Sequence, residues 1–306
     1  MTQAPPGRGA GDGTISRHAG PQAITAALVR ALVNEQFPEW SGLPVRFVAP
    51  GGNDHRTFRL GPRLSVRLPS AAAYVPQVVK EQTWLPRLAP AVPLPIPEVR
   101  GVGRPSARFA APWSVYGWLA GRPAASAPIE DPVRFADDLA AFLVALRSVD
   151  ATAGPGPGPH SAFRGGPVRH WDEEMRVLLQ RVKGRERDAA EGMWRDALTA
   201  PFTGSPVWFH GDVAMSNLLT RKGRLAAVID FGCSGVGDPA CDTVIHWTYF
   251  AGTGRRVFRK GLEVDDATWA RGRGWALWKA LIMLTNRTPG QAAFARHVLD
   301  ELMADA

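Results

Sequence analysis

Two short motifs, HGDVAMSN and IDFG, contain the polar residues of this chain that are best suited to chemistry. An apolar run, VWF, leads into His210 and Asp212, and Asn217 follows Asp212 by five residues. A second apolar run, LAAV, leads into Asp230. This spacing can bring two carboxylates and one amide oxygen to a single point. Phosphoryl transfer needs such a set, because a carboxylate orients the attacking hydroxyl and hard oxygen ligands hold Mg²⁺ against a triphosphate.

The first third of the chain is expected to form a β-rich unit that helps to position these motifs. Three runs of β character, VRFVAP, TFRL and LSVRLP, are separated by turns at Gly51–Gly52 and Gly61–Pro62, which predicts an antiparallel meander. A helix is expected over Ala23–Glu35. After four closely spaced prolines, WSVYGWL is expected to form a buried strand that begins at Trp113.

A helix is also expected over Ala72–Arg87, directly after the meander. Its apolar face, with Glu81 at the edge, has residues at helical spacing: Val75, Val78, Val79 and Leu85.

The remainder of the chain is predicted to be helical. Apolar residues from Leu139 to Leu146 recur at helical spacing, and the Gly- and Pro-rich stretch 151–159 is expected to be a loop. Further helices are expected at Trp171–Arg185, Pro239–Phe250, Asp266–Leu284 and Gln291–Met303. The prediction is an α+β fold of two lobes: a disordered tail (1–20), a nucleotide-binding N-lobe (21–116), and a helical C-lobe with the catalytic loop and acceptor site (117–306).

Composition narrows the possible functions. The chain has 306 residues, 36 Lys and Arg against 28 Asp and Glu, and a formal charge of +8. This surplus would suit a polyanion, but the arginines are scattered and lack an aromatic platform or zinc spacing, so we expect no nucleic-acid partner. Only Cys233 and Cys241 are cysteines, and no stretch reaches the ~20 apolar residues of a membrane span. We therefore expect a cytoplasmic protein with no membrane association.

HGD-x4-N followed by IDFG resembles the signature of the aminoglycoside phosphotransferase family, which is related to the protein kinases. The resemblance implies a protein-kinase-like fold and a Mg²⁺-dependent transfer from ATP or GTP to a small hydroxylated acceptor. It implies Asp212 as catalytic base, and Asn217 and Asp230 as metal ligands. His210 would brace the loop, and Ser216 is a candidate for a phosphate or metal-water contact.

The resemblance extends into the predicted N-lobe. GGNDHRTFRL looks like the turn over the nucleotide phosphates, which would place Gly52 and Asn53 against them. Arg67 stands where kinases carry a lysine on the third strand, and Glu81 stands where they carry its partner. Arginine keeps the charge but presents a planar fork, so the exchange is a real departure. The resemblance also implies that the backbone of Ser114, Val115 and Tyr116 binds the purine.

The acceptor is expected to bind in the C-lobe, where several downstream residues are candidates for contacting it: Asp238, Asp242, His246 and Trp275. Asp238 precedes Pro239, so a helix N-cap is the favoured interpretation for it, and helix packing is the favoured interpretation for His246. From Cys233 onward the chain has nine basic and eight acidic residues. A site for a polycation should be acidic, so we expect a neutral or weakly charged acceptor, such as a nucleoside-type or sugar-bearing antibiotic.

Four other readings remain open at this stage. They are a true aminoglycoside kinase, a metabolic small-molecule kinase, a nucleotide-binding pseudoenzyme and a protein kinase, although the chain lacks an APE segment and a long activation loop after IDFG.

Overall fold

A five-stranded antiparallel sheet forms the smaller lobe of the computed structural model, which describes residues 24–49, 54–285 and 289–305. The strand order is β1-β2-β3-β5-β4. The strands span β1 Val45–Phe47, β2 His55–Leu60, β3 Leu64–Pro69, β4 Val99–Gly103 and β5 Trp113–Gly117. The meander that the sequence predicts is thus confirmed for β1, β2 and β3. The tail 1–20, Gly52 and Asn53 lie outside the described residues.

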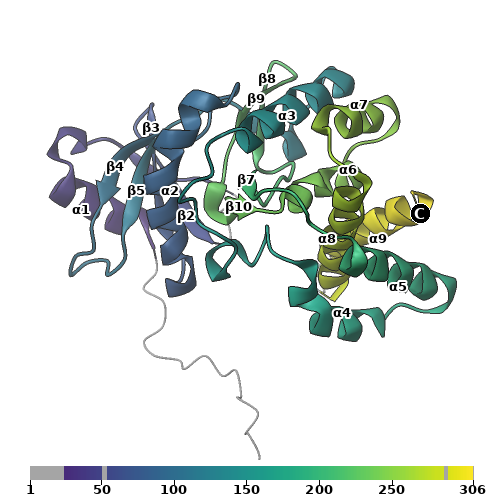
Figure 1. Cartoon of the computed structure of the whole chain (residues 1–306). Coiled ribbons are helices and arrows are strands. Elements are labelled where there is room, and N and C mark those ends of the chain that lie inside the picture. Colours follow the sequence, from purple (N-terminus) through teal and green to yellow (C-terminus); the bar gives the residue numbers. More distant parts are fainter. Residues whose placement is uncertain (1–23, 50–53, 286–288, 306) are drawn as a thin grey trace, which may run out of the picture.

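One helix covers each face of this sheet. Side chains alternate along β3, so that Val66 and Leu68 pack with α1 (Ala26–Gln36) in one apolar cluster. Arg67 points to the opposite face, where it meets Glu81 of α2 (Val75–Leu88). The alternation therefore places a buried charge between the sheet and α2, on the side of the larger lobe (Figure 1).

The strand β4 was not predicted from the sequence. It contains Gly101 and Gly103, which have low strand propensity. A Cβ added at Gly103 would lie 2.1 Å from the ring of Trp113, and one at Gly101 would lie 2.8 Å from the ring of Phe37. The glycines are needed because aromatic rings pack directly on the backbone of this strand.

Helix α2 differs from its predicted amphipathic pattern. Val78 and Leu85 are buried, but Val79 is 49% exposed, while Lys80 and Glu81 are buried. The buried face of α2 is therefore partly charged, because it contacts polar groups of both lobes.

Short strands lie between the two lobes and carry the motifs. β7 (Val207–Phe209) pairs with β10 (Gly235–Gly237), and β8 (Leu218–Arg221) forms a hairpin with β9 (Arg224–Val228). The HGD loop connects β7 to β8, and IDFG connects β9 to β10. Figure 1 shows β7 and β10 at the centre of the molecule, where the two lobes meet, and the β8–β9 hairpin at its upper edge.

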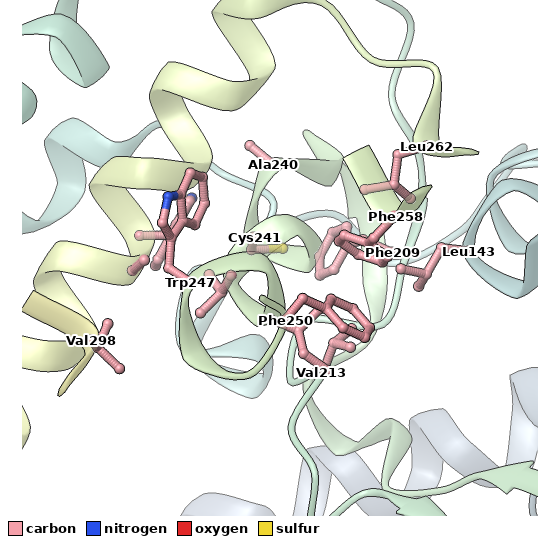
Figure 2. Packing of buried hydrophobic residues seen from close by; sticks show 14 of the residues in the cluster. Leu143, Phe209, Val213, Ala240, Cys241, Trp247, Phe250, Phe258, Leu262 and Val298 are labelled. Atoms are coloured by element: carbon pink, nitrogen blue, oxygen red, sulfur yellow. The ribbon is translucent and has the colours of Figure 1, made fainter. Parts of the chain in front are cut away.

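Helices form the larger lobe around one extensive core. Figure 2 shows Phe209 and Val213, on either side of the HGD loop, in the same cluster as Phe250 and Phe258. The helices span α3 Pro132–Arg147, α4 Asp172–Leu179, α5 Gly184–Thr199, α6 Ile245–Thr248, α7 Gly252–Leu262, α8 Asp266–Thr285 and α9 Pro289–Ala304. None of the helices in the described ranges is both long enough and apolar enough to span a membrane.

Two of these helices were missed at the sequence level. One helix was predicted over Trp171–Arg185. In the structure this helix ends at Leu179, and α5, which was not predicted, begins at Gly184, whose φ is +60°. α7 contains three glycines, which lower its helix propensity. It packs closely on α3: a Cβ at Gly261 would lie 2.9 Å from the Cβ of Ala140.

Candidate active site

Buried hydrogen bonds fix the shape of the HGD loop. Both carboxylate oxygens of Asp242 accept from this loop, from the backbone N–H of His210 at 2.8 Å and of Gly211 at 2.7 Å. Gly211 has a φ of +83°, and a Cβ there would lie 2.4 Å from the carbonyl of Cys233. The imidazole of His210 accepts from the N–H of Asp212 at its Nδ1 and faces the carbonyl of Ile229 with its Nε2 at 3.0 Å. His210 therefore links the two motifs, consistent with its predicted bracing role.

The carboxylate of Asp212 lies at the end of this loop and is partly exposed. One oxygen accepts from Asn217 Nδ2 at 3.0 Å, and the other accepts from Lys279 Nζ at 3.1 Å. Burial by itself raises the pKa of Asp212, but the positive charges of Lys279 and Arg164 outweigh burial and hold the pKa well below its usual value. Asp212 is therefore ionised at every physiological pH.

Asn217 and Asp230 fit the role of magnesium ligands. The Nδ2 of Asn217 is occupied by Asp212, so its Oδ1 is directed away from that contact, with only a long 3.5 Å bond from Ser216. Asp230 accepts from Arg67 through Oδ1, and no bond to Oδ2 is found within the described residues. Among the described residues, one carboxylate oxygen is therefore free, and the amide oxygen has only the long contact with Ser216. Mg²⁺ favours this kind of site, in which few protein oxygens complement phosphate oxygens and water.

Arg67 pairs with two carboxylates between the lobes, and a phenol binds one of them. Its guanidinium lies 3.2 Å from Glu81 Oε1 and 2.9 Å from Asp230 Oδ1, and the hydroxyl of Tyr116 donates to Glu81 Oε2 at 2.6 Å. Burial opposes the charge of Arg67, yet the carboxylates of Glu81 and Asp230 raise its pKa above the usual value, so it stays a cation. The predicted pairing of Arg67 with Glu81 is present in the structure.

Replacing Arg67 by Met should destabilise the protein by about 3 kcal/mol, because Glu81 is only 2% exposed and would lose its cation. Chemical denaturation measures this loss. Arg67→Lys should recover part of it, since one ammonium can pair with Glu81 but cannot also reproduce the fork to Asp230. An unchanged denaturation midpoint in Arg67→Met would contradict the assigned pairing.

The predicted purine contact at residues 114–116 stays a prediction, and the backbone of this segment is already paired within the sheet. These residues lie inside β5, whose backbone pairs with β3 on one side and β4 on the other. The side chain of Tyr116 points to Glu81. Within the described residues, the first backbone after β5 that makes no hydrogen bond is that of Leu119 and Ala120. The backbone that is free to bind a base therefore begins just beyond the predicted segment.

Three of the four acceptor candidates have structural roles instead. Asp238 caps the helical turn at Ala240 and forms a buried ion pair with Arg271 at 2.6 Å. Asp242 braces the HGD loop, as described above. His246 is 1% exposed and packs against two tryptophans, and burial lowers its pKa to about 4. The cap at Asp238 and the packing of His246 are therefore confirmed, and Asp242 is corrected from an acceptor contact to a brace of the HGD loop.

Trp275 does lie beside the Asp212 carboxylate. A small pocket at Asp212 is lined by residues of the HGD loop, the 3₁₀ turn Pro239–Val244 and α8, and by Arg164 from the loop before α4: Arg164, Gly211, Asp212, Val213, Cys241, Val244, Trp275, Trp278 and Lys279. Ser216 is exposed next to Asn217. Arg164 and Lys279 could not be identified from the sequence, because they lie 48 and 67 residues from Asp212 in the chain.

Comparisons with known proteins agree with this geometry. Residues 46–275 match the family model described as APH, the phosphotransferase enzyme family. No curated protein sequence matches the chain. The structure resembles the GDP and kanamycin complex of APH(2")-IIia, with 20% identity, a TM-score of 0.73, and coverage of 90% of this chain and 98% of that chain.

Two further solved structures are similar to this chain. The GDP complex of wild-type aminoglycoside 2'-phosphotransferase-IIIa has 21% identity, a TM-score of 0.70, and coverage of 92% and 99% of the two chains. Macrolide 2'-phosphotransferase MphH from Brachybacterium faecium has 19% identity, a TM-score of 0.61, and coverage of 90% and 97%. At these identities the structures establish the two-lobed fold. Because the family model covers three quarters of the sequence, the chain belongs to the APH phosphotransferase enzyme family.

Proposed function

We propose that this protein transfers the γ-phosphoryl group of ATP or GTP to a hydroxyl of a small antibiotic, in a reaction that depends on Mg²⁺. The observation that carries the proposal is the arrangement at Asp212. Asn217 donates to Asp212 through Nδ2 and leaves Oδ1 with only a 3.5 Å contact from Ser216, while Oδ2 of Asp230 has no bond within the described residues. Solved relatives contain GDP, ADP or ATP, which supports a nucleotide donor.

In this proposal the residues of the chain act mainly by alignment and charge. The acceptor hydroxyl donates to the Asp212 carboxylate and attacks the γ-phosphorus, and the bond from that phosphorus to the bridging oxygen of the nucleoside diphosphate breaks. Because the pKa of Asp212 is lowered, it accepts the hydroxyl proton late, once the new P–O bond has formed. Bound Mg²⁺, held by Asn217 and Asp230, would neutralise charge on the phosphate oxygens. We place the lobe boundary near residue 116, within β5.

We propose further that the acceptor is neutral or weakly charged. Among the described residues, Asp212 is the only carboxylate that lines the pocket, and it is accompanied by two cations, Arg164 and Lys279. Neighbouring carboxylates are already engaged inside the fold. Asp238 pairs with Arg271, and Glu174 accepts from the indole N–H of Trp278 at 2.8 Å. The indoles of Trp275 and Trp278 offer an apolar wall for a sugar or base.

Polycationic aminoglycosides such as kanamycin and streptomycin should therefore be poor acceptors. Uncharged nucleoside-type antibiotics and macrolides, which carry at most one amine, should be better, because the pocket offers no surplus of negative charge. Steady-state kinetics with a panel of both kinds at equal concentrations measures the difference. A kcat/KM for a polycation in the ~10⁴ M⁻¹s⁻¹ range of true substrates would refute the charge argument.

Replacing Lys279 by Met should move the acid limb of the pH–kcat/KM profile to higher pH. Asp212 must be ionised, so activity falls as the pH falls through its pKa. In the wild type that pKa is held low, so the profile should stay level through about pH 4, where an ordinary carboxyl titrates. Without Lys279, burial of Asp212 raises its pKa against less positive charge, since only Arg164 remains of the two cations. Lys260→Met, on the exposed face of α7, is the matched control; identical profiles for all three proteins would contradict the role of Lys279.

A further inference from the structure

Lys80 is a buried ammonium whose partners do not include a carboxylate. It is 6% exposed on α2, and within the described residues it has no acidic group within ion-pair distance. Its Nζ donates to the carbonyl of Gly232 at 2.7 Å and to that of Ser234 at 2.6 Å, and it lies 3.4 Å from Nδ1 of His160. Burying a charge without a counterion is costly, so a residue of this kind calls for a specific role.

The two carbonyls belong to the segment that directly follows Asp230. Asp230 has a φ of +67°, a left-handed conformation that a non-glycine residue keeps only when its surroundings hold it. The segment continues as a short 3₁₀ turn, Phe231–Cys233, closed by a bond from Ser234 Oγ to the carbonyl of Phe231 at 2.7 Å. Lys80 therefore anchors the backbone that sets where the Asp230 side chain points.

α2 reaches Asp230 by a second route that starts at the next residue. Glu81 pairs with Arg67, and Arg67 pairs with Asp230 Oδ1. The close approach of helix and segment also requires Gly232, where a Cβ would lie 2.8 Å from Gln77 Oε1. Lys80 holds the backbone and Glu81 acts on the carboxylate through Arg67, so one turn of α2 determines the orientation of this side chain.

We propose that Lys80 is a positioning residue for Asp230: by holding the carbonyls of Gly232 and Ser234, it keeps the free carboxylate oxygen directed toward the metal. This inference rests on the proposed function in assigning the metal to Asp230. The hydrogen bonds from Lys80 to the carbonyls of Gly232 and Ser234, however, do not depend on any activity. The two parts can be tested separately.

The first test uses the protein without nucleotide or metal. In Lys80→Met, which has similar length but no donors, backbone amides of residues 231–236 should exchange with deuterium at least about tenfold faster than in the wild type. Gln82→Met is the matched control, because it removes two hydrogen bonds of the same helix, to Trp113 O and Ser114 Oγ, on the side away from this segment. Unchanged exchange in residues 231–236 of Lys80→Met would overturn the proposed anchor.

The second test measures the metal directly. Mn²⁺ binding to the complex with a non-hydrolysable nucleotide, followed by electron paramagnetic resonance, should weaken about tenfold in Lys80→Met and remain near wild type in Gln82→Met. The half-saturating Mg²⁺ concentration for turnover should rise in parallel, more than kcat falls. If kcat and thermal stability fall while Mn²⁺ affinity is unchanged, Lys80 is merely structural and the proposal is wrong.

Lys80→Arg keeps the proposal testable if the Met variant does not fold. It retains a cation with several donors, so it should keep much of the protection of residues 231–236 and show an intermediate Mn²⁺ affinity. Full loss of Mn²⁺ binding with wild-type exchange would show that the metal depends on another feature. If exchange accelerates as expected but no variant or wild-type protein transfers phosphate, the proposed function fails while the anchor stands.

Discussion

Asp212→Asn should lower kcat by at least ~100-fold while leaving nucleotide affinity nearly unchanged. The amide keeps the shape of the carboxylate but loses its charge and basicity. It also places a donor opposite either Lys279 Nζ or Asn217 Nδ2, both of which donate to Asp212 in the wild type. The acceptor hydroxyl would lose its alignment and its proton acceptor at once.

Single-turnover kinetics and calorimetric nucleotide titration together measure this effect. Asp265→Asn is the matched control, since Asp265 is an exposed carboxylate that accepts from the backbone of Thr268 at the start of α8. The control should turn over like the wild type. Near-wild-type turnover by Asp212→Asn would remove Asp212 from its catalytic role.

Asp230→Asn should reduce kcat/KM for the Mg²⁺–nucleotide by ~100-fold or more, because the site loses its only anionic metal ligand in this scheme. Asn is a better probe than Ala here. The φ of Asp230 is +67°, and Asn tolerates the left-handed region, so the backbone should remain in place. The change then reports the lost charge and not a distorted loop.

Activity measured across a Mg²⁺ titration separates the possible causes. The variant should need a much higher Mg²⁺ concentration for half-saturation, and Mn²⁺ should restore part of the activity, because it binds a neutral amide oxygen more readily. Asp230→Asn also weakens the electrostatic attraction between residue 230 and Arg67. Arg67→Lys weakens the same contact from the other side and therefore serves as a comparison. An unchanged Mg²⁺ dependence would show that the metal is held elsewhere.

The grouping of Asp212, Asn217 and Asp230 was predictable from the sequence because these residues are close in the chain. HGD-x4-N and IDFG lie on two adjacent strand ends, and short hairpins fix how those ends meet. Arg67 and Glu81 were also predictable, since one lies on a strand of alternating pattern and the other on the helix that follows. Their ion pair at 3.2 Å agrees with that expectation.

Residues that reach the site from distant elements could not be predicted in this way. Lys279 comes from α8, whose buried residues surround the helix, so no single polar face marks it. Lys80 was hidden because a lysine in a helix is normally exposed, and only the tertiary structure shows it buried between the lobes. The pairing of the backbone of residues 114–116 with β4 could not be predicted either, because β4 was not evident in the sequence.

The remaining sequence errors share one physical cause. α7 and β4 are rich in glycine, and local propensity argues against both elements. Their glycines are needed for close contacts with Ala140 and Phe37, which are far away in sequence. Asp242 looked like a candidate for substrate contact because it follows IDFG, but it is buried and braces the HGD loop.

The most direct test of the account is whether phosphate from the donor becomes attached to a hydroxylated antibiotic. The purified protein is incubated with γ-¹⁸O-labelled ATP or GTP, Mg²⁺ and a panel of neutral and cationic antibiotics, and the products are analysed by mass spectrometry. The account predicts that a neutral or weakly charged member gains one labelled phosphoryl group, and that Asp212→Asn does not form this product. Nucleotide binding without any labelled acceptor across the panel, or labelling confined to polycations, would contradict it.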